Sequence, residues 1–160
     1  MSIRHAEASD VEIMGDIEGR SYPPEEGAST ERIRERVKAF PEYFWLLEED
    51  NKIKGFICGL QSNQDTLVDE MYENTAFHDP DGDWLLLFSV VTSPDFRRQH
   101  VASRLMKRAI ADNKARGKKG IVLTCKDNLK PFYEKFGFVS EGVSVSTHGG
   151  AVWYQMRLCH

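Results

Sequence analysis

The apolar run Trp84–Val91 constrains the fold of this chain more than any other feature. Its eight residues are broken only by Ser89 and fall far short of the roughly 20 that a membrane-spanning helix needs. A run of this length is typical of a strand that is covered on both faces. We therefore expect Trp84–Val91 to lie at the centre of a sheet that has other elements on either side.

The rest of the chain alternates between strand-like and helix-like patterns, which predicts a mixed α/β sheet. We predict strands at 3–6, 44–47, 53–58 and 121–124, helices at 10–20, 30–40, 101–116 and 128–136, and a closing hairpin from 138 to 156 around Gly149–Gly150. The strands 44–47 and 53–58 flank a polar turn and form a hairpin. Ser9 or Asp10 is the expected cap of the first helix, and Ser29 or Thr30 that of the second.

Composition limits the class of protein. The 160 residues are 41% hydrophobic and 29% charged, as in a soluble globular protein, and we expect one domain over 1–160. The net charge of −4 argues against a nucleic-acid partner. The first residues lack the apolar core of a signal peptide, and three cysteines leave an odd thiol. Both features favour a cytoplasmic protein without a membrane partner.

A basic turn, Arg97–Ala102, opens a helix directly after the buried strand. Such a turn directs several backbone N–H groups toward one point, where the helix dipole adds partial positive charge. A pyrophosphate suits this site, and Arg97 and Arg98 can supply charge-assisted hydrogen bonds to it. By spacing alone, a solvated basic turn is an equal alternative.

The spacing of Arg97, His100 and Ala102, with Tyr133 in the segment Phe-Tyr-Glu-Lys-Phe-Gly-Phe, resembles the GNAT superfamily of acetyl-CoA-dependent N-acetyltransferases. Residues 22–29, 125–133 and 147–150 are most similar to the arylalkylamine (serotonin) N-acetyltransferases. The resemblance implies a mixed, mostly antiparallel twisted sheet, flanked by helices, in which the two central parallel strands splay apart. It also implies acetyl-CoA as co-substrate.

The resemblance further implies a role for each residue of the cofactor site. Pantetheine would bind backbone groups of Val90 and Thr92 as an added strand does, and the N–H of Val91 would polarise the acetyl carbonyl. The turn would wrap the pyrophosphate. The cofactor-binding residues expected on this basis are Val90, Val91, Thr92, Arg97, Arg98, Gln99, His100, Val101, Ala102 and Ser103.

Tyr133 matches the family's catalytic tyrosine, which protonates the departing thiolate of coenzyme A. A phenol is protonated at neutral pH and can serve as this acid. The alternative is that the Tyr133 ring only packs in a short amphipathic helix.

The sequence departs from the family pattern at two places. Position 100 is His instead of the usual Gly, so a left-handed backbone there would cost about 1 kcal/mol. Leu86 and Phe88 stand where vertebrate serotonin acetyltransferases carry two histidines, so that proton relay is absent. Another group must then take the proton of the attacking ammonium, and His148 is the preferred candidate because imidazole titrates near neutral pH.

Several alternatives remain for the rest of the site. Glu25, Glu26 and Asp83 are further candidates for the base. An apolar acceptor pocket would be lined by Tyr22, Pro23, Leu86, Phe88 and Trp153, although Leu86 and Phe88 also suit a plain core. The histidines lack metal-ligand spacing, so no metal site is expected.

The leading interpretation is an enzyme that acetylates a small primary amine. A polyamine or a protein or peptide amine is an alternative acceptor, because the cofactor half would be the same. A non-catalytic acetyl-CoA sensor is a third reading, favoured by the missing histidines and opposed by Tyr133. Closing hairpins of this superfamily form dimers in some members, which leaves a homodimer open.

Overall fold

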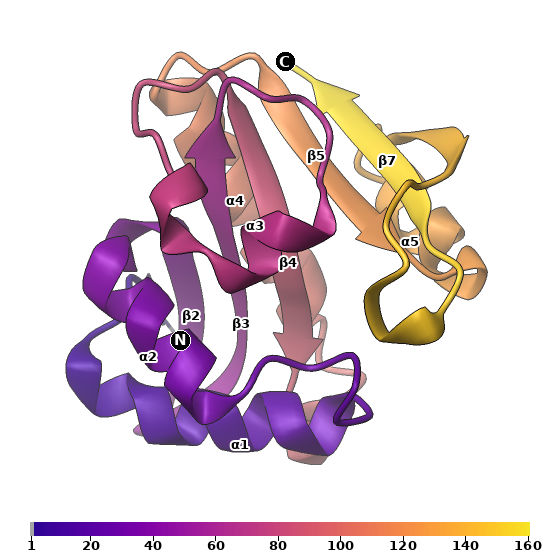
Figure 1. Cartoon of the computed structure of the whole chain (residues 1–160). Coiled ribbons are helices and arrows are strands. Elements are labelled where there is room, and N and C mark those ends of the chain that lie inside the picture. Colours follow the sequence, from indigo (N-terminus) through magenta and orange to yellow (C-terminus); the bar gives the residue numbers. More distant parts are fainter. Residues whose placement is uncertain (1) are drawn as a thin grey trace. The chain divides into compact units, whose positions relative to one another are not determined.

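A computed structural model describes residues Ser2–His160 and contains a seven-stranded sheet of order β1-β2-β3-β4-β5-β7-β6 (Figure 1). β4 and β5 pair in parallel, whereas β1–β2, β2–β3, β5–β7 and β6–β7 pair antiparallel. This mixed sheet with its flanking helices confirms the predicted fold class.

The contacts of the chain group into two compact units, which we describe separately. The first unit holds the chain up to Gly59 and the segment Ser89–Ala109. Its elements are β1 (Ser2–Arg4), α1 (Val11–Ser21), α2 (Thr30–Ala39), β2 (Phe44–Glu49), most of β3 (Lys52–Ser62), the end of β4 (Trp84–Thr92) and the first part of α4 (Val101–Ala115), with 3-10 turns at Ala8–Asp10, Pro41–Tyr43 and Pro94–Phe96.

Helices α1 and α2 begin close to their predicted starts. The apolar residues Val11, Met14 and Ile17 recur at helical spacing and are buried, as predicted. Ser29 caps α2, and its hydroxyl accepts a hydrogen bond from the Arg32 N–H. Asp10 occupies the predicted N-cap position of α1, but its carboxylate accepts from the Glu7 N–H and from Arg4 and makes no capping hydrogen bond to the helix.

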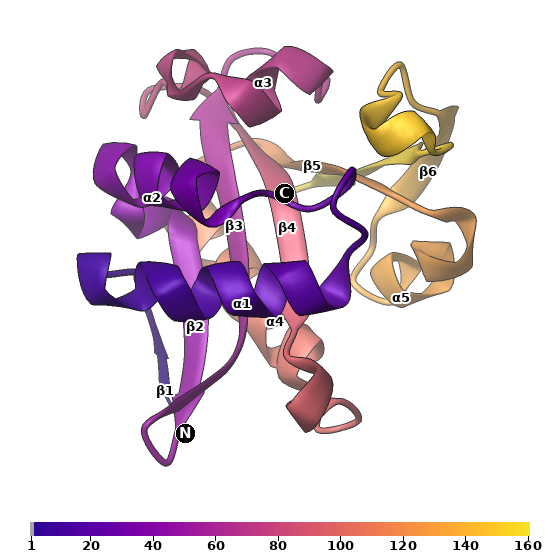
Figure 2. The same ribbon diagram turned by 60° about the horizontal axis from the view of Figure 1, so that its bottom comes forward.

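The predicted hairpin is confirmed, with a two-residue turn at Asp50–Asn51 between β2 and β3. Both turn residues have positive φ, 54° and 61°, which matches the twist of the flanking strands. Side chains then alternate along β3. A Cβ on Gly55 would meet Val101 of α4, while Cys58 lies beside Arg36 of α2, so the two helices pack on opposite faces of the strand (Figure 2).

The second unit holds Leu60–Phe88 and Ile110–His160. Its elements are the end of β3, α3 (Asp69–Glu73), the start of β4, the end of α4, β5 (Gly120–Cys125), α5 (Lys130–Glu134), β6 (Val139–Val143) and β7 (Tyr154–Cys159), with 3-10 turns at Thr75–Phe77, Asp127–Leu129 and His148–Gly150. The predicted helix 128–136 is shorter than expected, because Pro131 lies in the first turn of α5 and a 3-10 turn precedes it.

The parallel ladder joins Trp84–Leu87 of β4 to Gly120–Leu123 of β5. Both strands continue beyond it, to Thr92 and Cys125. Gly120 is required where β5 meets β7, because a Cβ there would lie 2.1 Å from the Leu158 carbonyl oxygen. Among residues 2–160, no helix has the length and apolar character needed to cross a membrane.

Candidate active site

The basic turn follows β4 at the point where the sequence predicts it. Ser93 is buried and its N–H donates to the Lys54 carbonyl (2.8 Å), which attaches the end of β4 to β3. A 3-10 turn, Pro94–Phe96, and the exposed residues Arg97–His100 then lead into α4. The turn thus presents its arginines and the first N–H groups of a 15-residue helix to solvent.

Two residues of this turn have left-handed backbone, Arg98 (φ 66°) and His100 (φ 59°). The left-handed conformation expected from the missing glycine is therefore present at position 100, and Arg98 adds a second instance that the sequence did not indicate. A turn of this kind can direct successive N–H groups into one concave anion site. Each such residue that is not Gly costs about 1 kcal/mol or more, and strain of this kind clusters at binding sites.

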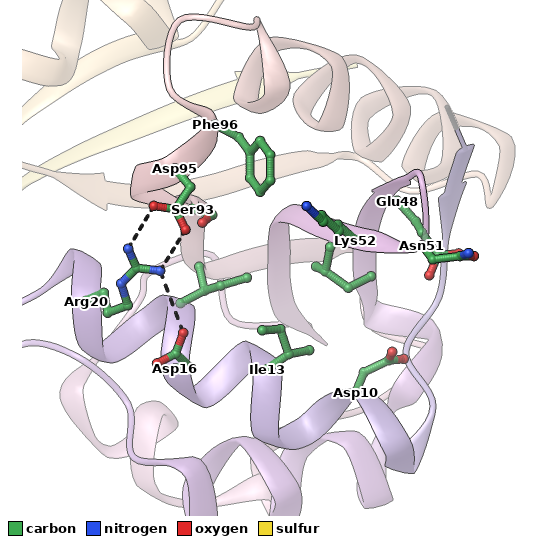
Figure 3. Close-up of a pocket in the computed structure, with 12 residues that line it drawn as sticks. Asp10, Ile13, Asp16, Arg20, Glu48, Asn51, Lys52, Ser93, Asp95 and Phe96 are labelled. Carbon is green, nitrogen blue, oxygen red and sulfur yellow. Dashed lines mark hydrogen bonds and ion pairs between the residues drawn. The ribbon is translucent and has the colours of Figure 1, made fainter.

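Buried and paired side chains of the first unit hold the turn in place. Lys54 is 7% exposed and donates to Glu49 (2.7 Å) and to the Gln99 side chain (3.1 Å). Its ammonium also lies 4.8 Å from the centre of the Phe96 ring. Arg20 of α1 donates two hydrogen bonds to Asp95 (3.0 and 3.1 Å), as Figure 3 shows. None of these contacts of Lys54 and Arg20 is predicted from the sequence.

A cavity of about 450 Å³ lies beside this anchor in the first unit (Figure 3). Its apolar lining includes Ile13 and Phe96, and its rim carries Asp16, Glu48 and Asp95. The lining comes from other residues than those predicted to bind the cofactor. Because most of the charged rim is acidic, the cavity does not suit a pyrophosphate.

The α1–α2 loop contacts the end of β4 within the first unit. The Tyr22 hydroxyl donates to the Val90 carbonyl (3.4 Å), which places a predicted acceptor residue against a predicted cofactor residue. Glu18 is 2% exposed and accepts hydrogen bonds from the Ala28 N–H (2.9 Å) and the Ser89 hydroxyl (3.3 Å). Glu18 is not among the predicted site residues, although its spacing of four residues from the buried Met14 places it on the inward face of α1.

Tyr133 lies in the second unit with its side chain buried, 6% exposed. Its ring packs edge-on against Phe132 and Phe138, at 5.0 and 5.8 Å between ring centres. Burial, with a smaller contribution from Cys125, raises the pKa of Tyr133, so the phenol is protonated at neutral pH. The same burial raises the pKa of Cys125 to about 11, which makes that thiol a poor nucleophile. The packing role of Tyr133 is therefore observed, and the protonation state fits the acid role.

Four rings form what we call the aromatic cluster of the second unit: Tyr72, Phe88, His148 and Trp153. Tyr72 lies 4.9 Å from Phe88 and stacks on His148 at 4.7 Å with 9° between the planes. Trp153 lies 6.3 Å from His148, and its indole N–H donates to the His148 carbonyl (2.8 Å). Phe88, His148 and Trp153 are predicted site residues, whereas Tyr72, which lies in the polar segment after β3, is not.

The family model of the Acetyltransferase (GNAT) family matches residues 11–138, which run through both units. The chain belongs to this family. A curated relative, serotonin N-acetyltransferase of Mesocricetus auratus, is 28% identical over 134 residues, 81% of this chain and 63% of the relative. The chain thus spans less than two thirds of that relative's length.

Solved structures of GNAT proteins share the fold. The GNAT-like decarboxylase GphF, in complex with isobutyryl-CoA, has a TM-score of 0.85 at 19% identity, covering 99% of each chain. The ribosomal-protein-S18-alanine N-acetyltransferase of Escherichia coli has a TM-score of 0.70 at 19% identity, covering 99% of this chain and 92% of its own. At these identities the likeness is one of fold alone.

Asp83 and Leu86 lie in positions that do not suit the roles predicted for them in the acceptor half of the site. Asp83 immediately precedes β4 and pairs with Lys119 (3.4 Å), directly before β5. It therefore lies at the opposite end of β4 from Val90, and the suggestion that it deprotonates the amine is wrong. Leu86 is fully buried at the centre of the parallel ladder, beside Val122 of β5, in agreement with the core alternative.

Proposed function

We propose that this chain transfers the acetyl group of acetyl-CoA to the primary amine of a small molecule. The observation that carries the proposal is the basic turn of a GNAT-family chain, which opens α4 directly after β4 and contains two left-handed residues. A nitrogen-lined turn of this kind suits a pyrophosphate. GphF, a neighbour in fold, is described in complex with a coenzyme A thioester, which supports the same class of ligand.

In this proposal the first unit binds the carrier. Backbone groups of Val90 and Thr92 hold pantetheine, the turn with Ser103 holds the pyrophosphate, and Arg97 and Arg98 contribute charge. The N–H of Val91 donates to the acetyl carbonyl and stabilises the negative charge that grows there. The amine nitrogen attacks the carbonyl carbon, the C–S bond breaks, and Tyr133 donates its proton to the thiolate.

The acceptor half is assigned to Tyr22 and Pro23 of the α1–α2 loop and to the aromatic cluster. Flat rings favour an amine with an aromatic or apolar tail. His148 is half-buried and takes the proton that the ammonium must lose before it attacks. The similarity to serotonin N-acetyltransferase supports this acceptor class.

Two other acceptors, and a role without catalysis, compete with this proposal. A peptide amine is supported by the fold neighbour from Escherichia coli that acetylates the alanine of a ribosomal protein. A polyamine is the third acceptor. A sensor would bind acetyl-CoA without turnover, and a homodimer and a cytoplasmic setting are compatible with each of these.

Release of coenzyme A, measured against a panel of arylalkylamines, polyamines and short peptides, tests the proposal. We expect turnover with free amines that carry an apolar tail. Turnover of peptides alone would indicate the protein-directed enzyme. Micromolar binding of acetyl-CoA in calorimetry without turnover of any amine would indicate the sensor, and absence of binding would overturn the proposal altogether.

A further inference from the structure

The Asp69 carboxylate of helix α3 contacts the loop between β6 and β7. Asp69 accepts hydrogen bonds from the Ser146 hydroxyl and from the Thr147 N–H (3.1 Å) and hydroxyl (3.4 Å). Ser146 is buried, 3% exposed, and its hydroxyl oxygen also accepts from the His148 N–H (3.3 Å). A chain of hydrogen bonds thus runs from α3 to the backbone of His148.

A hydrogen bond from the Gly150 N–H to the Thr147 carbonyl (2.7 Å) closes a short turn at His148. Gly149 and Gly150 follow it directly, both with positive φ (65° and 73°), and glycine is the residue with the most backbone freedom to lose on ordering. On this side the His148 carbonyl accepts hydrogen bonds from the Trp153 indole N–H (2.8 Å) and from the Ala151 N–H (3.3 Å). The contacts of Asp69 add a restraint on the N-terminal side of the histidine.

The ring of His148 is held by a second residue of the same helix. Tyr72 lies three residues after Asp69, hence on the same face of α3, and stacks on the imidazole nearly in parallel, at 9°. The Tyr72 hydroxyl is 3.4 Å from the Thr124 hydroxyl at the end of β5, which fixes the tyrosine ring in turn. Backbone and ring of His148 are thus both held by α3.

We propose that Asp69 is a positioning residue for His148, acting with Tyr72, which supports the ring. The inference rests on the proposed function of His148 as the base. Both carboxylate oxygens of Asp69 are engaged by the loop, so Asp69 acts through the loop and not on the substrate. A misplacement of a base by about 1 Å lowers a rate by up to about 10²-fold.

A double-mutant cycle in kcat tests the proposal. We expect Asp69→Ala to lower kcat about tenfold and His148→Ala to lower it about 10²-fold. In the His148→Ala background, Asp69→Ala should have no further effect, because its only route to the reaction is gone. Glu70→Ala, an exposed neighbour on the same helix, is the matched control and should leave kcat unchanged. An equal loss from Asp69→Ala in both backgrounds would overturn the proposal.

A readout independent of activity separates this inference from the proposed function. Stacking on Tyr72 should shift the His148 ring protons upfield in NMR spectra, and Tyr72→Leu identifies that shift by removing it. We expect Asp69→Ala to reduce the shift, whereas a shift that survives Asp69→Ala would refute the positioning role. If His148→Ala leaves kcat unchanged, His148 is not the base. The NMR shift then still shows whether Asp69 holds the His148 ring in place. Should Asp69→Ala fail to fold, Asp69→Asn, which retains one acceptor oxygen, replaces it with a smaller expected effect.

Discussion

At the scale of single residues, burial sets the protonation of one candidate group of the second unit, and two residues of the basic turn in the first unit adopt costly backbone. Burial raises the pKa of Tyr133, which keeps the phenol protonated. Arg98 and His100 have left-handed backbone, and the nearby turn residues Gln99 and Asp95 are bonded to Lys54 of β3 and Arg20 of α1. Strained backbone and perturbed pKa values are both common at functional sites, where they lower the stability of the fold.

Tyr133→Phe tests the acid role. We expect kcat to fall about 10²-fold because the thiolate loses its proton donor, while the Kd of acetyl-CoA changes less than about twofold. Single-turnover kinetics and calorimetry measure the two effects. Since the ring and its packing are retained, a single-turnover rate equal to that of the unaltered protein would remove Tyr133 from the mechanism.

His100→Gly should stabilise the protein. Glycine adopts φ near 59° without the Cβ clash that His100 bears, and we expect the free energy of unfolding to rise by about 1 kcal/mol. Gly117→Ala is the reverse control, because Gly117 has φ 76° and open space around it, and it should cost about 1 kcal/mol. Urea denaturation measures both, and a destabilised His100→Gly would show that the imidazole contributes contacts worth more than the strain.

At the scale of elements, β4 is the strand on which the site depends, and its end is shaped by its neighbours β3 and α4. Gly55 of β3 allows this close approach, since a Cβ there would lie 2.6 Å from the Val91 carbonyl oxygen and 2.7 Å from a Val101 methyl group. The backbone at Val91, which is proposed to bind the acetyl group, thus packs so closely against β3 that position 55 has no room for a side chain.

Gly55→Ala should therefore displace the end of β4. We expect a loss of about 1–3 kcal/mol in the free energy of unfolding, together with weaker acetyl-CoA binding. Gly19→Ala is the matched control, because Gly19 is exposed on α1 with nothing within 4 Å, and it should gain up to about 1 kcal/mol. If Gly55→Ala is destabilised but binds acetyl-CoA with unaltered affinity, the end of β4 does not contribute to cofactor binding.

At the scale of the whole molecule, the chain consists of two compact units, and the residues of β3, β4 and α4 are divided between them. The family match runs through both, and the single domain over 1–160 stays a prediction. Within the first unit, the ion pair of Arg4 with Asp10 (2.8 Å) joins β1 to the start of α1. We expect this ion pair to contribute to the free energy of unfolding and to make it depend on pH.

Asp10→Asn should lower stability in a pH-dependent manner. Burial by itself would raise the pKa of Asp10, but hydrogen bonds from Arg4 and the Glu7 N–H outweigh it, and the pKa lies below its ordinary value of 3.8. The ionised carboxylate therefore stabilises the fold above about pH 4 and loses that contribution as the pH falls further. We expect Asp10→Asn to cost about 1–2 kcal/mol at pH 7 and progressively less below pH 4. A constant difference in the free energy of unfolding from pH 7 to pH 2 would contradict this assignment.

The sequence alone determined most of the elements and the basic turn, because helix and strand periods and the apolar run Trp84–Val91 are local properties of the chain, although the helix predicted at 128–136 is shorter in the structure. It also located Tyr133 and His148 through short motifs. Tertiary structure decided which side chains meet. Asp69 reaches Ser146 across 77 residues and Tyr72 reaches Thr124 across 52, and local spacing carries no information about such contacts. The fold likewise places Asp83 at the start of β4, away from Val90, and brings the Glu18 carboxylate to the Ala28 N–H and the Ser89 hydroxyl, because packing decides which partners a charged side chain meets.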